Sequence, residues 1–170
     1  MRVVVTGTPG TGKTTATERL DREVVHLNDR IHEEGLDAGT DESRDSLVAD
    51  MDAVEAFLDE RTSGDIELVE SHLAHRLPAD RIVVLRCDPD ELGERLAARG
   101  ESEASVAENR ESEALDVILA EAVEEHGADS VYEIDASERT PEEVAAEIER
   151  VVAGEREPSA GTVSFLDALS

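Results

Sequence analysis

Aromatic residues and cysteine are scarce in this sequence. It has two Phe, one Tyr and no Trp, so its core must be built from aliphatic side chains. Its one cysteine, Cys87, excludes a disulfide within the chain, and we expect it to be a small buried hydrophobe rather than a nucleophile. No apolar run approaches the roughly 20 residues that a membrane helix needs, and no secretory leader precedes the first apolar run. We therefore expect a soluble, cytoplasmic protein with no membrane partner.

Lysine is nearly absent as well. Of the 16 basic residues only Lys13 is a lysine, whereas Asp and Glu number 43 and are spread along the chain, which gives a formal net charge of -27. A surface of this sign repels phosphate, so we expect no strong direct binding of nucleic acid. Because concentrated salt screens such self-repulsion, the composition indicates a halophilic protein.

The single lysine belongs to a glycine-rich motif near the start of the chain. An apolar run at 2–6 leads into residues 7–15, which read Gly-Thr-Pro-Gly-Thr-Gly-Lys-Thr-Thr and open a helical pattern. This is the context and spacing of a phosphate-binding loop. Its glycines let backbone N–H groups turn toward phosphate oxygens, and the helix adds its positive N-terminal end. The sequence therefore predicts that Lys13 reaches the β- and γ-phosphates of a nucleoside triphosphate and that Thr14 ligates Mg²⁺.

Apolar runs alternate with helical patterns along the chain, which predicts an α/β fold with a parallel, doubly wound sheet. The predicted strands are 2–6, 23–27, 66–69, 81–87 and 131–134. Three of the predicted helices are 14–22, 50–61 and 115–126. Three others are predicted from their ends: a helical turn capped by Asn28 or Asp29 that runs to Glu34, a helix that begins at Asp88-Pro89 and ends at Gly100, and a helix capped by Thr140 that runs to about Val152.

Three stretches lack a clear period. Residues 35–46 are polar and rich in turn residues, which predicts an exposed, mobile insert. Residues 101–113 are strongly polar and are compatible with a hinged lid. Glycine, proline and serine mark a tail from 154, in which we expect the apolar residues between 163 and 169 to dock as a short helix.

Glu70 and His72 lie where the third predicted strand ends. Residues two apart on a strand point to the same side, and open α/β sheets bind ligands at this carboxyl edge. We hypothesise that Glu70 holds a magnesium-bound water and that His72 orients the phosphoryl acceptor; the alternative is a solvated strand end. His75 is expected to be an ordinary loop residue.

Arg95 and Arg99 lie one turn apart on a predicted helix. Guanidinium groups bind phosphate in a bidentate manner, so the two residues are candidates for a phosphate clamp. They are equally compatible with a solvated helix face paired with Glu91 and Glu94. The same two alternatives apply to Arg86 at the end of its strand.

Taken together, these motifs resemble the nucleoside monophosphate kinase superfamily and, within it, the adenylate kinase 6 type of archaea and eukaryotes. The resemblance covers residues 1–153. It rests on the phosphate loop at 7–15, on Glu70-Ser71-His72, on Val84-Leu85-Arg86-Cys87-Asp88, and on Arg95-Leu96-Ala97-Ala98-Arg99-Gly100 with Glu108-Asn109 beyond. It implies a three-layer P-loop NTPase fold with a five-stranded parallel sheet, a small NMP-binding insert at about 26–48 and a short lid at about 98–108, followed by a tail at 154–170.

The resemblance also implies site residues, with Mg-ATP and Mg²⁺ as the bound groups. The implied catalytic residues are Lys13, Glu70 and His72. The implied magnesium contacts are Thr14 and, through water, Glu70. The implied ATP contacts are Gly10, Gly12, Lys13, Thr14, Thr15 and Arg99. The implied monophosphate region contains His26, Asp29, His32 and Gly39.

The implied activity is transfer of the ATP γ-phosphoryl group to AMP by a monomeric enzyme of broad nucleotide tolerance. An ATPase role in maturation of the small ribosomal subunit, with a ribosomal protein as partner, is implied beside it. Two residues depart from the family pattern: Glu70 stands where Asp is usual, and His32 stands where a basic residue is expected. An ATPase with little AMP kinase activity and another small-molecule P-loop kinase, of nucleoside or shikimate type, remain alternatives.

Overall fold

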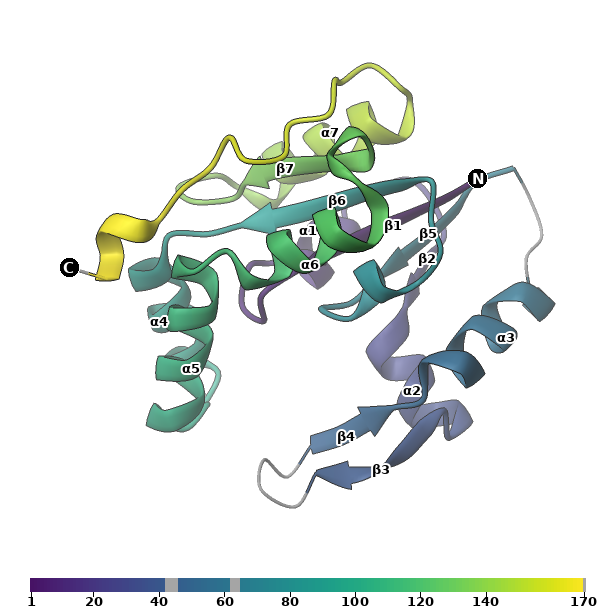
Figure 1. Cartoon of the computed structure of the whole chain (residues 1–170), viewed down its shortest axis with the longest axis horizontal. Helices are drawn as coiled ribbons and strands as arrows, with labels where there is room; N and C mark the ends of the chain where they lie inside the picture. Colours follow the sequence, from purple (N-terminus) through teal and green to yellow (C-terminus); the bar gives the residue numbers. More distant parts are fainter. Residues whose placement is uncertain (42–45, 62–64, 170) are drawn as a thin grey trace.

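A parallel sheet forms the centre of the computed structural model, which describes residues 1–41, 46–61 and 65–169 (Figure 1). Within these ranges the sheet has five strands in the order β2-β5-β1-β6-β7. The strands are β1 (Arg2–Gly7), β2 (Val24–His26), β5 (Glu67–Glu70), β6 (Arg81–Arg86) and β7 (Val131–Asp135). All four neighbouring pairs are parallel, so the predicted sheet is confirmed.

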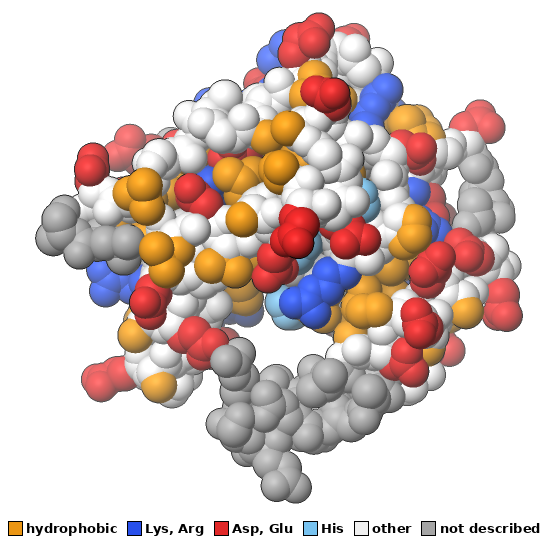
Figure 2. All heavy atoms as spheres, viewed as in Figure 1, with side chains coloured by type: hydrophobic (Ala, Val, Ile, Leu, Met, Phe, Trp, Pro, Cys, Tyr) orange, Lys and Arg blue, Asp and Glu red, His pale blue; other side chains and the backbone are white. Residues whose placement is uncertain are grey.

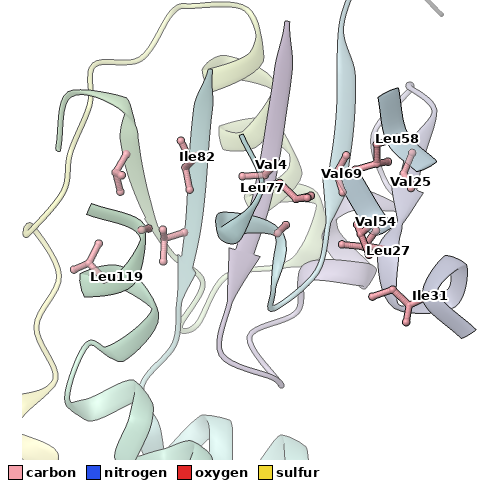
Figure 3. Packing of buried hydrophobic residues seen from close by; sticks show 14 residues of the cluster. Val4, Val25, Leu27, Ile31, Val54, Leu58, Val69, Leu77, Ile82 and Leu119 are labelled. Carbon is pink, nitrogen blue, oxygen red and sulfur yellow. The ribbon is translucent and has the colours of Figure 1, made fainter. Parts of the chain in front are cut away.

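Helices cover both faces of the sheet. Successive strand residues point to opposite faces, and the buried strands are apolar on both, so each face packs against helices. On one face Val4 packs in a cluster with α2 (Leu27–Glu34), α3 (Met51–Arg61) and α6 (Val117–His126), as Figure 3 shows. On the other face Val3 and Val5 pack with α1 (Lys13–Thr17) and α7 (Pro141–Val152). The core is almost wholly aliphatic, and the predicted three-layer fold is confirmed.

Two helices, α1 and α2, differ from their predictions at one end. Helix α1 ends at Thr17 instead of residue 22, and the Thr17 hydroxyl donates to the carbonyl of Lys13 at 2.8 Å, a bond that competes with regular helix. Helix α2 begins at Leu27, so Asn28 and Asp29 lie inside its first turn and do not cap it. The Asn28 side chain instead accepts a hydrogen bond from the Ser71 hydroxyl at 2.7 Å.

The segment predicted as an irregular insert contains a two-stranded antiparallel sheet. Strand β3 (Asp37–Asp41) pairs with β4 (Ser46–Ala49), and Asp50 N–H donates to the Leu36 carbonyl at 2.9 Å at the base of the pair. The expected insert at 35–46 is therefore not irregular throughout, because it contains β3 and the first residue of β4, which backbone pairing holds. Residues 42–45 of the insert lie outside the described residues.

The polar stretch after residue 100 is helical. It forms α5 (Glu103–Ala114), which is capped by the Ser102 side chain and tied to α4 (Pro89–Ala98) by an ion pair between Arg110 and Asp90. Asp116, with φ of 57°, separates α5 from α6, so the predicted apolar helix starts at Val117. The predicted caps of α4 and α7, Asp88 and Thr140, are confirmed.

The tail runs beside β7 toward the end of α5 (Figure 1). Ser159 N–H donates to the Val131 carbonyl at 3.0 Å, and the predicted short helix is η3 (Leu166–Leu169). Shorter helical turns lie at η1 (Ala74–Arg76) and η2 (Ala128–Ser130). None of the helices in the described ranges is both long and apolar enough to cross a bilayer.

Candidate active site

The phosphate loop connects β1 to α1 at the carboxyl edge of the sheet. Gly10 and Gly12 have φ of 94° and 92°, a region that L side chains rarely adopt. A Cβ on Gly10 would lie 2.9 Å from Leu92 Cδ1, so packing against α4 also requires glycine there. The loop thus has the curled backbone that the motif predicted.

Lys13 is buried inside the loop, with 8% of its surface exposed. Its ammonium donates to the Thr8 carbonyl at 3.2 Å. Burial lowers the pKa of Lys13 to about 8, although Glu70 and Glu113 favour the charged form, and Arg99 lowers it further. The ammonium is therefore poorly solvated and poised to gain from an incoming phosphate anion.

Glu70 and Thr14, the two residues expected near Mg²⁺, meet beside the loop. The Thr14 hydroxyl donates to Glu70 Oε1 at 2.9 Å, and His26 Nδ1 lies 2.9 Å from the same oxygen. Glu70 is 5% exposed, because β5 lies between β1 and β2 in the sheet. One hydroxyl and one carboxylate suit Mg²⁺, which keeps several waters and takes further oxygens from phosphates. No group of three or more metal-binding side chains occurs among the residues described, so no all-protein metal cage is present there.

His72 lies just beyond the same strand. Burial lowers the pKa of His72 to about 4, and the positive charges of Lys13 and Arg76 lower it further, so its ring is neutral at pH 7. His72 Nδ1 lies 3.5 Å from the Asn28 amide, on the side of α2. The ring can therefore exchange hydrogen bonds with an acceptor but brings no charge to it.

The predicted monophosphate residues are only partly brought together. His26 reaches Glu70, whereas Asp29 and His32 are exposed along α2. Gly39 pairs with Val48 in the β3–β4 hairpin. In Figure 1 the hairpin and the α4–α5 pair project in the same direction from the sheet.

A cavity of about 250 Å³ lies between the loop, α4 and the segment after β7, whereas Glu70 ends β5 on the other side of β1. Its walls include four of the predicted ATP contacts, Gly10, Gly12, Thr15 and Arg99. The segment after β7 adds Ala136, Arg139, Pro141 and Val144, which sequence reasoning missed because they form no recognisable motif. Apolar and guanidinium walls beside a phosphate loop have the character of a nucleoside pocket.

The two remaining arginine candidates, Arg95 and Arg86, lie in different surroundings. Arg95 lines the cavity, pairs with Glu91 at 2.7 Å and donates to the Gly10 carbonyl at 3.4 Å. The expected pairing with Glu91 is present, and the phosphate clamp stays a prediction. Arg86 is 1% exposed and ion-paired with Glu113, which excludes both a phosphate clamp and a solvated face.

Two further residues are buried. Cys87 is fully buried, and burial raises the pKa of its thiol to about 12, in line with the expected structural role. His75 was expected in an ordinary loop, but it is 1% exposed within η1. Its ring lies 2.9 Å from the Thr6 hydroxyl and 2.7 Å from a Glu121 oxygen, so it bridges β1 and α6.

Comparison with known proteins agrees with this geometry. A family model described as an AAA domain matches residues 3–116. A protein named "Putative adenylate kinase" from Natronomonas pharaonis is 64% identical over 171 residues, covering 99% of this chain and 100% of that protein. Proteins of the same name from Halobacterium salinarum and Methanosarcina acetivorans are 57% and 44% identical, covering 98% and 89% of this chain and 99% and 86% of their own lengths.

A solved structure supports the fold independently. The crystal structure of shikimate kinase from Bacteroides thetaiotaomicron superposes with a TM-score of 0.58 at 16% identity, covering 91% of this chain and 98% of that one. At this identity the likeness concerns the fold, which is that of a P-loop kinase. The chain therefore belongs to the family of adenylate kinase-like P-loop proteins that the AAA domain model and these archaeal relatives represent.

Proposed function

We propose that this protein is an ATP:AMP phosphotransferase of the adenylate kinase 6 type. The observation that carries the proposal is the meeting of the Thr14 hydroxyl and the Glu70 carboxylate, 2.9 Å apart, beside the buried ammonium of Lys13. Phosphoryl transfer needs positioning and charge compensation more than covalent chemistry, and these groups supply both. The names of the archaeal relatives favour AMP as acceptor.

Each residue has a distinct role in the proposed reaction. Lys13 leaves the Thr8 carbonyl to meet the β- and γ-phosphates, and the loop N–H groups bind the same oxygens. Thr14 and, through a water molecule, Glu70 would hold Mg²⁺, which when bound would neutralise phosphate charge. Arg99 and Arg95 compensate charge from the side of α4.

The acceptor is assigned to the other side of Glu70. In this proposal the insert at about 26–48 receives AMP near His26, Asp29, His32 and Gly39, and the segment at about 98–108 acts as the lid. His72, neutral at pH 7, orients the acceptor by hydrogen bonding. We propose a monomer as the active unit.

A second candidate is an ATPase that assists maturation of the small ribosomal subunit. The net charge of -27 favours this reading, because it complements a basic ribosomal protein. His32 is exposed and stands where a basic residue is expected, so it is a weaker anchor for the AMP phosphate than an arginine would be. Under this reading water replaces AMP as the acceptor, and the basic partner increases turnover.

Product analysis separates these readings. The purified protein is incubated with Mg-ATP in concentrated KCl, with and without AMP, and ADP is resolved from free phosphate. The kinase predicts ADP formation that requires AMP, whereas the ATPase predicts phosphate release without it. A different small-molecule kinase would produce neither. Lys13→Ala is expected to abolish turnover in every case, and an unaffected variant would overturn the assignment of the phosphate loop.

A further inference from the structure

Glu113 lies in the last turn of α5, behind the phosphate loop, and no step of the proposed reaction uses it. Glu113 is 2% exposed, and a glutamate is rarely buried to this extent unless its charge is paired. Both of its oxygens accept hydrogen bonds. Because both oxygens are hydrogen-bonded inside the protein, the carboxylate has a fixed position and can fix the position of the groups that it binds.

On the side of the loop, Glu113 holds Thr8. The Thr8 hydroxyl donates to Glu113 Oε1 at 2.9 Å, and Thr8 itself is 1% exposed. The Thr8 carbonyl is the point where the loop converges, because it accepts from the Thr11 hydroxyl at 2.8 Å and from the Lys13 ammonium at 3.2 Å. The position of Thr8 therefore determines where the Lys13 ammonium lies in the protein without nucleotide.

On the other side, Glu113 is held by β6. Its Oε2 accepts from Cys87 N–H at 2.8 Å and from Arg86 Nε at 3.3 Å. Arg86 is buried in turn, and it also binds Glu133 at 2.9 Å and Asp116. The carboxylate cannot turn away from Thr8 without breaking bonds to the sheet.

The tail completes this support. The Val163 carbonyl accepts from Arg86 Nη1 at 3.4 Å, and the guanidinium carbon lies 5.4 Å from the centroid of the Phe165 ring. A continuous set of contacts thus runs from the tail through Arg86 and Glu113 to Thr8 and Lys13. The negative charge of Glu113 also favours the protonated form of Lys13.

We propose that Glu113 is a positioning residue that acts through Thr8 to preorganise the phosphate loop and Lys13 for Mg-ATP. The proposal rests on the proposed function only in taking Mg-ATP as the ligand. It makes α5 a support of the loop, in addition to its assignment as part of the lid.

The test removes only the hydroxyl that links the two residues. Thr8→Val keeps the shape of the side chain but cannot donate to Glu113, whereas Thr8→Ser is the matched control that keeps the hydroxyl. Binding of Mg-ATP is titrated calorimetrically for both variants and the unmodified chain. We expect Thr8→Val to raise the Kd about tenfold, the scale of one hydrogen bond to a charged group, and Thr8→Ser to stay within about twofold.

A merely structural role gives a different result. It would reduce the fraction of folded, binding-competent molecules while their Kd stayed unchanged, and that outcome would overturn the proposal. If Thr8→Val does not fold, Glu113→Asp decides, because it keeps the charge but shortens the reach to Thr8; it should raise the Kd, and an unchanged Kd would refute the positioning role. The titration contains no AMP, so a chain that binds ATP yet fails to phosphorylate AMP would refute the proposed function and leave this inference standing.

Discussion

At the scale of single residues, Lys13 combines burial with a charge that the site needs. Desolvation lowers its pKa to about 8 from the usual 10.5, so the free protein begins to lose the ammonium just above neutral pH. Phosphate binding favours the charged form, and the unliganded protein has to be protonated at Lys13 to recruit its ligand well.

We therefore predict that kcat/KM for ATP is highest below about pH 8 and falls as the pH rises through that value. The sign follows from the lowered pKa, because the ammonium is present below it and absent above it. A pH profile of kcat/KM reports the free enzyme and is the appropriate measurement. A profile that stays flat until about pH 10 would contradict the burial argument.

Glu70 is the second residue whose charge the account requires. Replacing it with Gln keeps the side-chain shape but removes the negative charge beside Thr14, so we expect kcat to fall about 100-fold or more and the Mg²⁺ requirement to rise. Glu67→Gln, at the far end of the same strand and paired with Arg2, is the matched control and should leave kcat unchanged. Equal kcat values for the two variants would remove Glu70 from the site.

How far single residues could be predicted depends on their neighbours in sequence. Lys13, Thr14 and Glu70 lie at strand ends or in a motif, and the parallel sheet brings such positions together at one edge. Glu113 and Arg86 had no such signal, because a glutamate in a polar helix and an arginine at a strand end usually face solvent. Their burial depends on contacts between distant elements, because Glu113 at the end of α5 binds Arg86 and the tail covers Arg86 in turn.

At the scale of elements, the tail closes one edge of the sheet. Glu133 on β7 is 1% exposed, and its carboxylate accepts from Arg86 and from the backbone N–H groups of Gly161 and Thr162. Arg156 also donates to the Glu133 carbonyl at 2.8 Å. The tail therefore supplies donors to a buried charge that the sheet alone does not satisfy.

We predict that deleting residues 154–170 lowers the free energy of unfolding by about 2 kcal/mol or more, because Glu133 loses two backbone donors. Deleting only 166–170 removes η3 but keeps these bonds, and it should cost much less. Denaturant unfolding of both truncated proteins checks this. Equal losses would mean that η3, rather than the bonds to Glu133, holds the tail.

The helices and strands differ in how closely they could be predicted from their sequences. Strands β1 and β6 are nearly continuous apolar runs, and α4 and α7 carry clear caps, so their positions were predicted closely. The β3–β4 hairpin and α5 are mostly polar, and their structure depends on pairing or packing that the side-chain pattern does not show. The length of α1 was overestimated because the Thr17 hydroxyl donates back to the carbonyls of Lys13 and Thr14 at the end of the helix.

At the scale of the whole molecule, the dominant feature is the charge of -27. On the face shown in Figure 2, Asp and Glu side chains are spread over the surface instead of forming one patch. Such a distribution repels itself in the folded state, and the range of that repulsion shrinks from about 10 Å at 0.1 M salt to about 3 Å at 1 M.

We accordingly predict that the midpoint temperature of unfolding rises when KCl is increased from about 0.1 M to about 2 M. Like charges lie closer together in the folded state than in the unfolded state, so screening of their repulsion stabilises the folded state. Thermal unfolding followed by circular dichroism at several KCl concentrations measures this. Activity should increase over the same range. A midpoint that falls with salt would show that ion pairs, and not net repulsion, govern stability.

The central claim is that the loop, Glu70 and the acceptor side together form a phosphotransferase site. The most direct measurement follows the fate of ATP labelled in its γ-phosphoryl group, with unlabelled AMP present. With a phosphotransferase site the label appears in ADP, and Glu70→Gln suppresses this transfer while Glu67→Gln does not. Label that appears only in inorganic phosphate, at a rate indifferent to AMP, would contradict the account.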